Sequence, residues 1–294
     1  MNDRHAYMIM AHNQWTLLIH LLKALDYEYN DLYLHLDKKM GDVDYSQLYS
    51  QLKYAKLYIL TNRLDVTWGN YSQIQCEMNL LAEATKTKHL YYHLMSGVDF
   101  PLKSQQNIHA FFRENYGTEF VQFEAKKIDK KIQQRVSKYH FNTKRLDDKT
   151  LFDRIVYRIL MTLQLRVNRI QNTDIIFQKG ANWFSITEEL AKYVLGKQDV
   201  IEKWFRYTLC GDEMFLQTIV FNSPFREKIA KNNFCDNNET ILYCIDWTRG
   251  KPYEYTEEDY NYLIDSGMLF ARKFNWEKDY RIILKLLDLV YEDK

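Results

Sequence analysis

Hydrophobic and polar positions follow two different periods along the first hundred residues of the chain. Four short segments have the pattern of buried or half-buried strands: 6–11, 31–37, 57–60 and 90–95. Apolar residues recur with helical spacing at 16–25 and 74–84. Alternating strands and helices predict an α/β fold with an open, mainly parallel sheet covered by helices, which binds ligands at the carboxyl ends of its strands.

The pattern changes in the middle of the chain. From Ala125 to Gln171 it is helical and charged, without Gly or Pro, and this predicts an inserted helical segment. Strand character returns at 174–177, and a turn with a short strand follows at 180–186. Thr187 then caps a predicted helix, and 242–247 predicts a late strand.

Composition narrows the class of protein. The chain has 294 residues, 46% of them hydrophobic, which is enough for a substantial core. It contains no apolar run of about 18 residues and no cleavage site after its first residues, so we expect a cytoplasmic protein. Four widely spaced cysteines without a metal pattern predict reduced thiols. Cys210 is either a small packed residue or, beside two acids, a reactive thiol.

The formal net charge of +1 conceals an asymmetry. Residues 125–170 contain 13 Lys or Arg and 4 Asp, a local charge of +9, so the remainder sums to −8. This basic segment predicts either an anionic partner or a solvated helix face. No nucleic-acid motif accompanies the charge, and an anionic membrane surface or a lipid-linked acceptor fits it.

Two adjacent carboxylates, Asp212 and Glu213, stand at the start of an apolar helical run. The free N–H groups of a first helical turn favour acids, so Asp212 is predicted to cap this helix, which would by itself account for the pair. Segments 96–102 and 266–274 likewise set polar side chains among Gly and aromatics, as is typical of residues held at loop ends by a rigid frame.

The usual phosphate-binding motifs are missing from the sequence. It has no GxGxxG, no P-loop and no DxD pair, so any phosphate would have to be bound by cationic side chains. Arg272 and Lys273 lie between apolar residues and are candidates for stabilising a diphosphate leaving group. Two solvated bases at a strand end are the alternative interpretation.

Taken together, several ordered segments resemble the core-2/I-branching β-1,6-N-acetylglucosaminyltransferase family, which includes the peptide xylosyltransferases. The resemblance is to compact bacterial members and leaves out most of 126–172. The segments that carry it are 9–12, 35–38, 68–69, 96–102, 180–184, 212–218, 245–247 and 270–274.

The resemblance implies a GT-A-type glycosyltransferase fold and metal-independent transfer from a UDP-sugar with inversion at the anomeric carbon. It implies that Glu213 is the catalytic base and that Lys273 meets the diphosphate. A second, arginine partner is expected to be Arg249, with Arg272 as the alternative. An inverting displacement needs such a base on one side and charge stabilisation on the other. No cofactor and no metal ion are expected.

Five further residues are assigned to substrates. Asp37, with His12 close by, is expected to meet uracil or ribose; the alternative for His12 is a histidine at a strand end whose hydrogen bonds are satisfied within the protein. Asp99 is expected either to orient the donor sugar or to close a turn. Trp183 is predicted to stack on the acceptor sugar, with a place in the core as its alternative, and Asp212 is placed beside the acceptor.

We expect one catalytic domain over 1–294. Its parts are a nucleotide-sugar-binding half (1–122), a basic helical insertion (123–172) and an acceptor and catalytic half (173–294). N-acetylglucosamine or xylose is the expected sugar, and a surface polysaccharide built on a lipid carrier at the inner face of the membrane is the expected product. A noncatalytic carbohydrate- or nucleotide-binding module and a basic scaffold are the competing hypotheses.

Overall fold

A five-stranded sheet forms the central layer of the protein, as a computed structural model shows for residues 3–141, 150–230, 234 and 238–292. Its strand order is β3-β2-β1-β4-β6, with the first four strands parallel and β6 antiparallel to β4. The strands are β1 (His5–Ala11), β2 (Asn30–Leu36), β3 (Lys56–Ile59), β4 (Tyr91–Ser96) and β6 (Ser185–Thr187). The predicted α/β class and mainly parallel central sheet are confirmed.

Alternate side chains of β1 enter two separate cores, because successive residues of a strand face opposite sides of the sheet. Tyr7 and Ile9 join one apolar cluster and Ala6 and Met8 the other, all fully buried. This explains the continuous apolar run of β1, which is covered on both faces.

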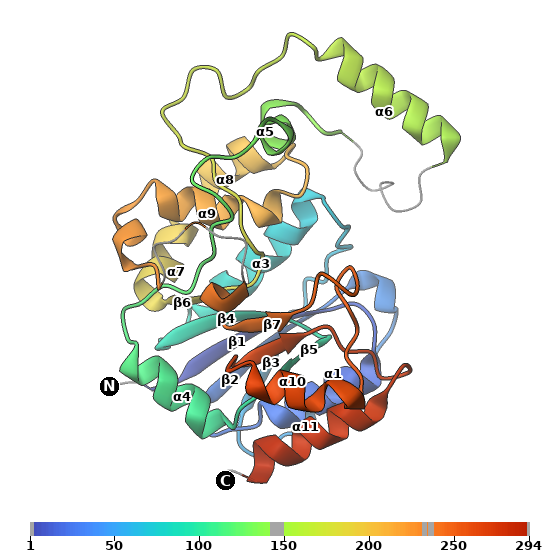
Figure 1. Cartoon of the computed structure of the whole chain (residues 1–294), viewed down its shortest axis with the longest axis vertical. Coiled ribbons are helices and arrows are strands. Elements are labelled where there is room, and N and C mark those ends of the chain that lie inside the picture. Colours follow the sequence, from blue (N-terminus) through green and yellow to red (C-terminus); the bar gives the residue numbers. More distant parts are fainter. Residues whose placement is uncertain (1–2, 142–149, 231–233, 235–237, 293–294) are drawn as a thin grey trace.

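Helices cover both faces of the sheet (Figure 1). One group is α3 (Tyr71–Ala84), α7 (Glu188–Leu195), α8 (Gln198–Phe205) and α9 (Phe215–Phe221). On the other side lie α1 (Trp15–Ala24), α10 (Tyr260–Asp265) and α11 (Tyr280–Glu292). The remaining helices are α2 (Ser46–Tyr49), α4 (Gln105–Glu114), α5 (Lys130–Ser137) and α6 (Leu151–Leu163). None of the helices in these described ranges is both long and apolar enough to span a membrane.

A second, three-stranded sheet joins distant parts of the chain in the order β5-β8-β7. Its strands are β5 (Asp99–Pro101), β7 (Tyr243–Ile245) and β8 (Phe270–Arg272). A tight turn at Gly97 leads from β4 into β5, and a Cβ there would come within 2.8 Å of the Ala11 Cβ. The predicted halves of the chain exchange strands, because β6 of the second half pairs in the first sheet and β5 of the first half pairs in the second sheet. The division of the domain at residue 122 stays a prediction.

Every element predicted before residue 100 is confirmed, although α3 begins at Tyr71 because the Asn70 side chain accepts the Ser72 N–H. The strands predicted at 180–186 and 242–247 are present as the shorter β6 and β7. The helix predicted at Thr187 is α7, and the Thr187 hydroxyl accepts the Leu190 N–H at 3.4 Å.

The strand predicted at 174–177 is wrong. Side chains of α9 and its end satisfy the backbone there: the Asn222 amide oxygen accepts the Ile176 N–H at 3.0 Å, and the Thr218 hydroxyl accepts the Gln178 N–H at 3.1 Å. The helical character predicted for 125–171 is present in α5 and α6. Only α5 and α6 are helical in its described part, and residues 142–149 lie outside the described residues.

Candidate active site

A cavity of about 1290 Å³ opens at the carboxyl ends of the parallel strands, where ligands of such sheets bind. His12 follows β1, Asp37 follows β2 and Ser96 ends β4, and all three line it. The opposite walls come from loops after residues 179 and 245 and from the end of β8. The cavity therefore combines segments from both halves of the sequence.

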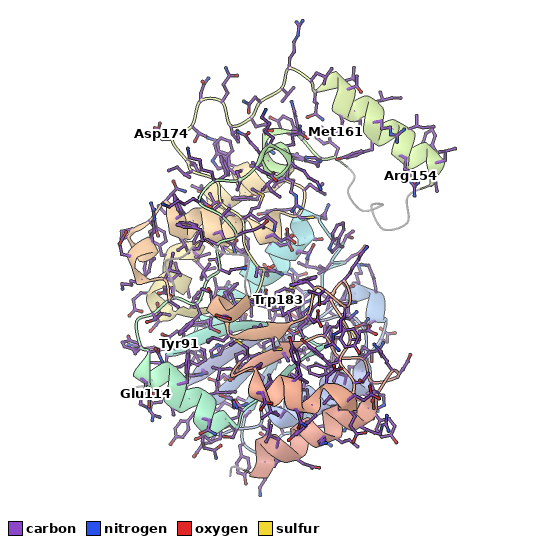
Figure 2. All side chains as sticks on the ribbon, viewed as in Figure 1. Tyr91, Glu114, Arg154, Met161, Asp174 and Trp183 are labelled. Atoms are coloured by element: carbon purple, nitrogen blue, oxygen red, sulfur yellow. The ribbon has the colours of Figure 1, made fainter. Side chains whose placement is uncertain are left out.

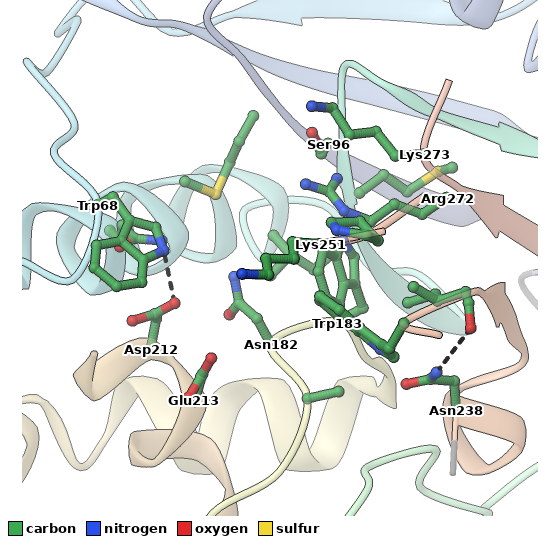
Figure 3. Close-up of a pocket in the computed structure, with 18 of the residues that line it drawn as sticks. Trp68, Ser96, Asn182, Trp183, Asp212, Glu213, Asn238, Lys251, Arg272 and Lys273 are labelled. Atoms are coloured by element: carbon green, nitrogen blue, oxygen red, sulfur yellow. Dashed lines mark hydrogen bonds between the residues drawn. The ribbon is translucent and has the colours of Figure 1, made fainter. Parts of the chain in front are cut away.

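Two carboxylates form one wall of the cavity (Figure 3). Asp212 and Glu213 lie in a 3-10 turn, Gly211–Glu213, just before α9. The Glu213 side chain is 35% exposed, which leaves it accessible from the cavity. Asp212 is buried behind it, so the two neighbours differ in their access to a substrate.

Two cations from outside this turn position the Glu213 carboxylate. The guanidinium of Arg135, on α5, donates to Glu213 Oε2 at 2.7 Å, and the Lys179 Nζ lies 3.8 Å from the same oxygen. The loop that carries Lys179 is held by the Gly180 N–H, which donates to the Glu213 carbonyl at 2.9 Å. A side chain at Gly180 would collide with the Gln122 carbonyl, so this contact requires glycine.

The prediction that Asp212 caps the apolar helix is wrong. Met214 occupies the N-cap position of α9, and no side chain caps that helix. Asp212 Oδ2 instead accepts from the Gln73 amide at 3.1 Å, and Trp68 points toward it across the cavity edge (Figure 3). Burial, with the neighbouring charge of Glu213, raises the pKa of Asp212 to about 7. Its proposed contact with the acceptor stays a prediction.

Cationic side chains form the facing wall (Figure 3). The Arg272 guanidinium donates to Asp99 Oδ1 at 2.7 Å and lies 4.5 Å from the centre of the Trp183 ring. The Lys273 Nζ is 3.2 Å from Glu254 Oε1 and remains partly exposed. Each of these cations is thus held by a carboxylate while it lines the cavity.

Asp99 is placed behind this wall. It is fully buried and is not among the residues that line the cavity. Its Oδ2 accepts the Ser96 N–H at 2.7 Å, which closes the turn after β4. Of its two sequence interpretations, turn closure is the one that the geometry shows. Asp99 contacts two residues that line the cavity, Ser96 and Arg272.

Arg249 and Lys251 enter the cavity from the loop after β7. Arg249 is hydrogen-bonded to Asp246 and, at 2.7 Å, to Asp259, and its guanidinium lies 4.0 Å from the centre of the Tyr253 ring. These contacts occupy much of its hydrogen-bonding capacity. Lys251 lines the cavity and forms no ion pair with the described residues, and Figure 3 shows it pointing toward Asn182.

The remaining predicted residues also lie at the cavity. His12 is exposed on its rim. Asp37 is buried and accepts the Lys39 and Val66 N–H groups at 2.8 and 3.0 Å. Trp183 is half-buried and lines the cavity, with one partner, Arg272, already on its ring. Their roles toward substrates stay predictions.

Sequence reasoning missed three cations of the site: Arg135, Lys179 and Lys251. Lys179 directly precedes the glycine-led turn that the sequence singled out, so its position was a usable signal. No sequence signal distinguished Arg135, because it is one of 13 basic residues in the segment 125–170, which was assigned to membrane or acceptor contact. Cys210 is a buried thiol whose pKa burial raises to about 12, which fits the packed role.

The family model described as "Branch: Core-2/I-Branching enzyme" matches residues 5–263. The chain is 23% identical over 303 aligned positions to "Xylosyltransferase 2" of Rattus norvegicus, covering 97% of this chain and 33% of that protein. It is 23% identical to "Xylosyltransferase oxt" of Drosophila pseudoobscura pseudoobscura, covering 98% of this chain and 33% of the relative. The chain therefore spans about a third of the length of these curated relatives.

Proposed function

Because the chain belongs to the Core-2/I-Branching enzyme family, we propose that it is an inverting glycosyltransferase that moves a sugar from a UDP-sugar to a hydroxyl of a glycan acceptor. The observation that carries the proposal is the division of one cavity into an acidic wall, with Glu213, and a cationic wall, with Arg272 and Lys273 (Figure 3). An inverting displacement needs these two kinds of group on opposite sides of the anomeric carbon.

In the proposed reaction, Glu213 removes the proton of the acceptor hydroxyl. The acceptor oxygen forms a bond to the anomeric carbon while the bond from that carbon to the diphosphate oxygen breaks on the opposite face. UDP leaves with the electron pair of that bond. Lys273 and Arg272 stabilise its developing charge, which supports a reaction without a metal ion.

The second phosphate partner in this proposal is Arg272 and not Arg249. Arg272 is adjacent to Lys273 and has one carboxylate partner, whereas Arg249 has two. Lys251 joins the same wall. N-acetylglucosamine and xylose remain the proposed sugars, and the similarity to xylosyltransferases supports xylose. A lipid-linked precursor of a surface polysaccharide is the proposed acceptor, with the basic segment 125–170 as its membrane contact.

A donor screen tests the function. UDP release would be measured with a panel of UDP-sugars, with and without excess EDTA, using the Glu213→Gln protein as the matched control. We expect release with one sugar of the panel, unchanged by EDTA and strongly reduced in the control. Equal release by wild type and control would contradict the proposed base. Loss of release in EDTA that manganese restores would contradict the metal-independent reaction.

A further inference from the structure

Helix α6 presents an apolar face that no described part of the protein covers. The helix has no buried residue and stands apart from the main body (Figure 1). Five large apolar side chains on it, between 37% and 76% exposed, are spaced as one stripe of a helix: Phe152, Ile155, Val156, Ile159 and Leu163. Isolated exposed apolar residues are ordinary, but a continuous stripe marks an interaction surface.

The helix is nevertheless well defined at both ends. Its first turn has a complete capping box, in which the Thr150 hydroxyl and the Asp153 carboxylate satisfy each other's backbone N–H groups. At its other end, the Gln164 side chain accepts the Tyr139 N–H at 2.8 Å and donates to the Tyr139 carbonyl at 2.9 Å. The exposed stripe thus belongs to an anchored element.

These anchors also set the direction of the stripe. Tyr157 of α6 faces the body, and its hydroxyl lies 3.1 Å from His140 Nδ1. At about 100° per residue, Tyr157 lies roughly 160° around the helix from Ile159, in the middle of the stripe. The apolar face therefore points away from the body. Figure 2 shows Arg154 and Met161 near the two ends of the helix, far from Trp183 at the cavity.

The charge around α6 favours an anionic surface. Arg158 is exposed on the helix about 100° around from Ile159, which places it beside the stripe. Residues 125–170 together carry a net charge of +9. A second copy docked through the same face would bring two such segments together, and like charges at close range disfavour it. A helix with an apolar stripe and a flanking arginine, in a basic segment, suits the headgroup boundary of an anionic bilayer, where the guanidinium stays hydrated.

We propose that α6 lies in the interface of an anionic membrane, with Phe152, Ile155 and Ile159 entering the apolar layer and Arg158 contacting lipid phosphates. This inference deepens the proposed membrane association and rests on it. It assigns the hydrophobic part of the contact to one helix. The basic residues elsewhere in the segment supply attraction that salt screens, whereas the apolar insertion persists at higher salt.

Vesicle flotation with the full chain tests the inference without donor or acceptor. The probes are vesicles of equal parts phosphatidylglycerol and phosphatidylcholine, and vesicles of phosphatidylcholine alone. The variant is Ile155→Ser with Ile159→Ser, and the matched control is Ile176→Ser. Ile176 is 52% exposed, close to the 54% of Ile159, but lies outside the stripe. UDP release with a soluble acceptor is measured in parallel, so failure of docking and failure of transfer are seen separately.

We expect the double variant to lose about tenfold or more of its partitioning to the anionic vesicles, since one well-inserted aliphatic side chain is worth about a factor of ten. The Ile176→Ser protein should partition like the wild type, and all three should bind phosphatidylcholine weakly. Equal flotation of wild type and double variant would overturn the proposal. The proposal would also be overturned if the wild type did not bind vesicles but formed dimers that the double variant does not form, because a second copy of the chain would then cover the stripe.

Discussion

The two ends of the five-stranded sheet carry the same residue types in opposite surroundings. At the amino end, Asp31 of β2 accepts from Arg4 and, at 2.9 Å, from His89, while His5 of β1 stacks on His109 with ring centres 3.8 Å apart. All these His and Asp side chains are buried. At the carboxyl end, His12 and Asp37 follow the same two strands and line the cavity. Histidine and aspartate on a strand therefore indicate function only where the fold leaves them facing a cavity.

The difference lies in what satisfies the polar groups. At the amino end most of them pair with one another inside the core, as is usual for buried polar groups, while His5 Nε2 and His89 Nδ1 have no hydrogen-bond partner among the described residues. At the carboxyl end the charged groups have partners within the protein and an open side toward the cavity: Arg135 and Lys179 hold Glu213, Asp99 holds Arg272 and Glu254 holds Lys273. This arrangement fixes the charges and leaves them available to a substrate.

Replacing the proposed base at the carboxyl end should have the largest effect. Glu213→Gln keeps the size of the side chain but cannot accept the acceptor's proton, so turnover should fall by about 10²–10⁴-fold. UDP affinity should stay near normal, because the cationic wall is intact. Turnover and UDP binding would be measured on the same preparations.

Asp212→Asn is the control for this substitution and should impair turnover far less. A Glu213→Gln enzyme with near-normal turnover would remove the proposed base. An Asp212→Asn enzyme with the greater loss would transfer that role to Asp212.

The cationic wall should respond next. Lys273→Ala and Arg272→Gln should each weaken UDP binding by about tenfold or more, the range for a lost hydrogen bond to a charged group. Arg249→Gln should have a smaller effect, since its guanidinium is engaged by Asp246 and Asp259. Calorimetric titration with UDP measures all three.

Thermal unfolding of the same variants separates lost contacts to UDP from lost structure, because Arg272→Gln also removes the partner of the buried Asp99. Equal losses of UDP affinity for Arg249→Gln and Arg272→Gln would contradict the choice of Arg272.

Replacing one aspartate at each end of the five-stranded sheet compares the two ends directly. Asp31→Asn should cost about 1.5–3 kcal/mol of stability, because it weakens hydrogen bonds to a charged partner, and should leave UDP affinity unchanged. Asp37→Asn should lower UDP affinity. Chemical denaturation and UDP titration of both variants test this. If UDP affinity fell in the Asp31 variant and not in the Asp37 variant, the nucleotide would bind at the amino end of the sheet and not at the carboxyl end.

The smallest expected effects are those of pH, and they have opposite signs at the two ends. Burial lowers the pKa of His109 to about 4 and that of His5 and His93 well below the usual range. The unfolded chain therefore binds protons first as the pH falls, and stability is lost below about pH 6.5. Asp212 acts in reverse: with its pKa raised to about 7, the folded state binds the proton first, and stability rises as the pH falls from 8 toward 6.

The free energy of unfolding of Asp212→Asn minus that of the wild type should consequently be greater at pH 8 than at pH 6, by on the order of 1 kcal/mol. On acidification from pH 8 to 6 the variant should lose stability where the wild type gains it or stays level. Denaturant unfolding at both pH values measures the difference. Parallel pH profiles for the two proteins would show that Asp212 does not titrate in this range.

The amino-acid sequence determined the order of local elements and the chemical types in the site. Periodicity is a local property, so β1 to β4 and the helices α1 and α3 followed from it, whereas the four-residue α2 did not. The ordered segments around Glu213, Arg272 and Lys273 indicated the family, and the cavity contains residues from most of them.

Only the tertiary structure decided which charges meet. Arg272 and Asp99 are paired across 173 positions and Arg135 and Glu213 across 78, distances over which no sequence period extends. The strand predicted at 174–177 and the cap predicted at Asp212 failed for the same reason. Their backbone and side-chain groups found partners on other elements, Asn222 and Gln73, and the choice among competing partners is made by packing and not by local preference.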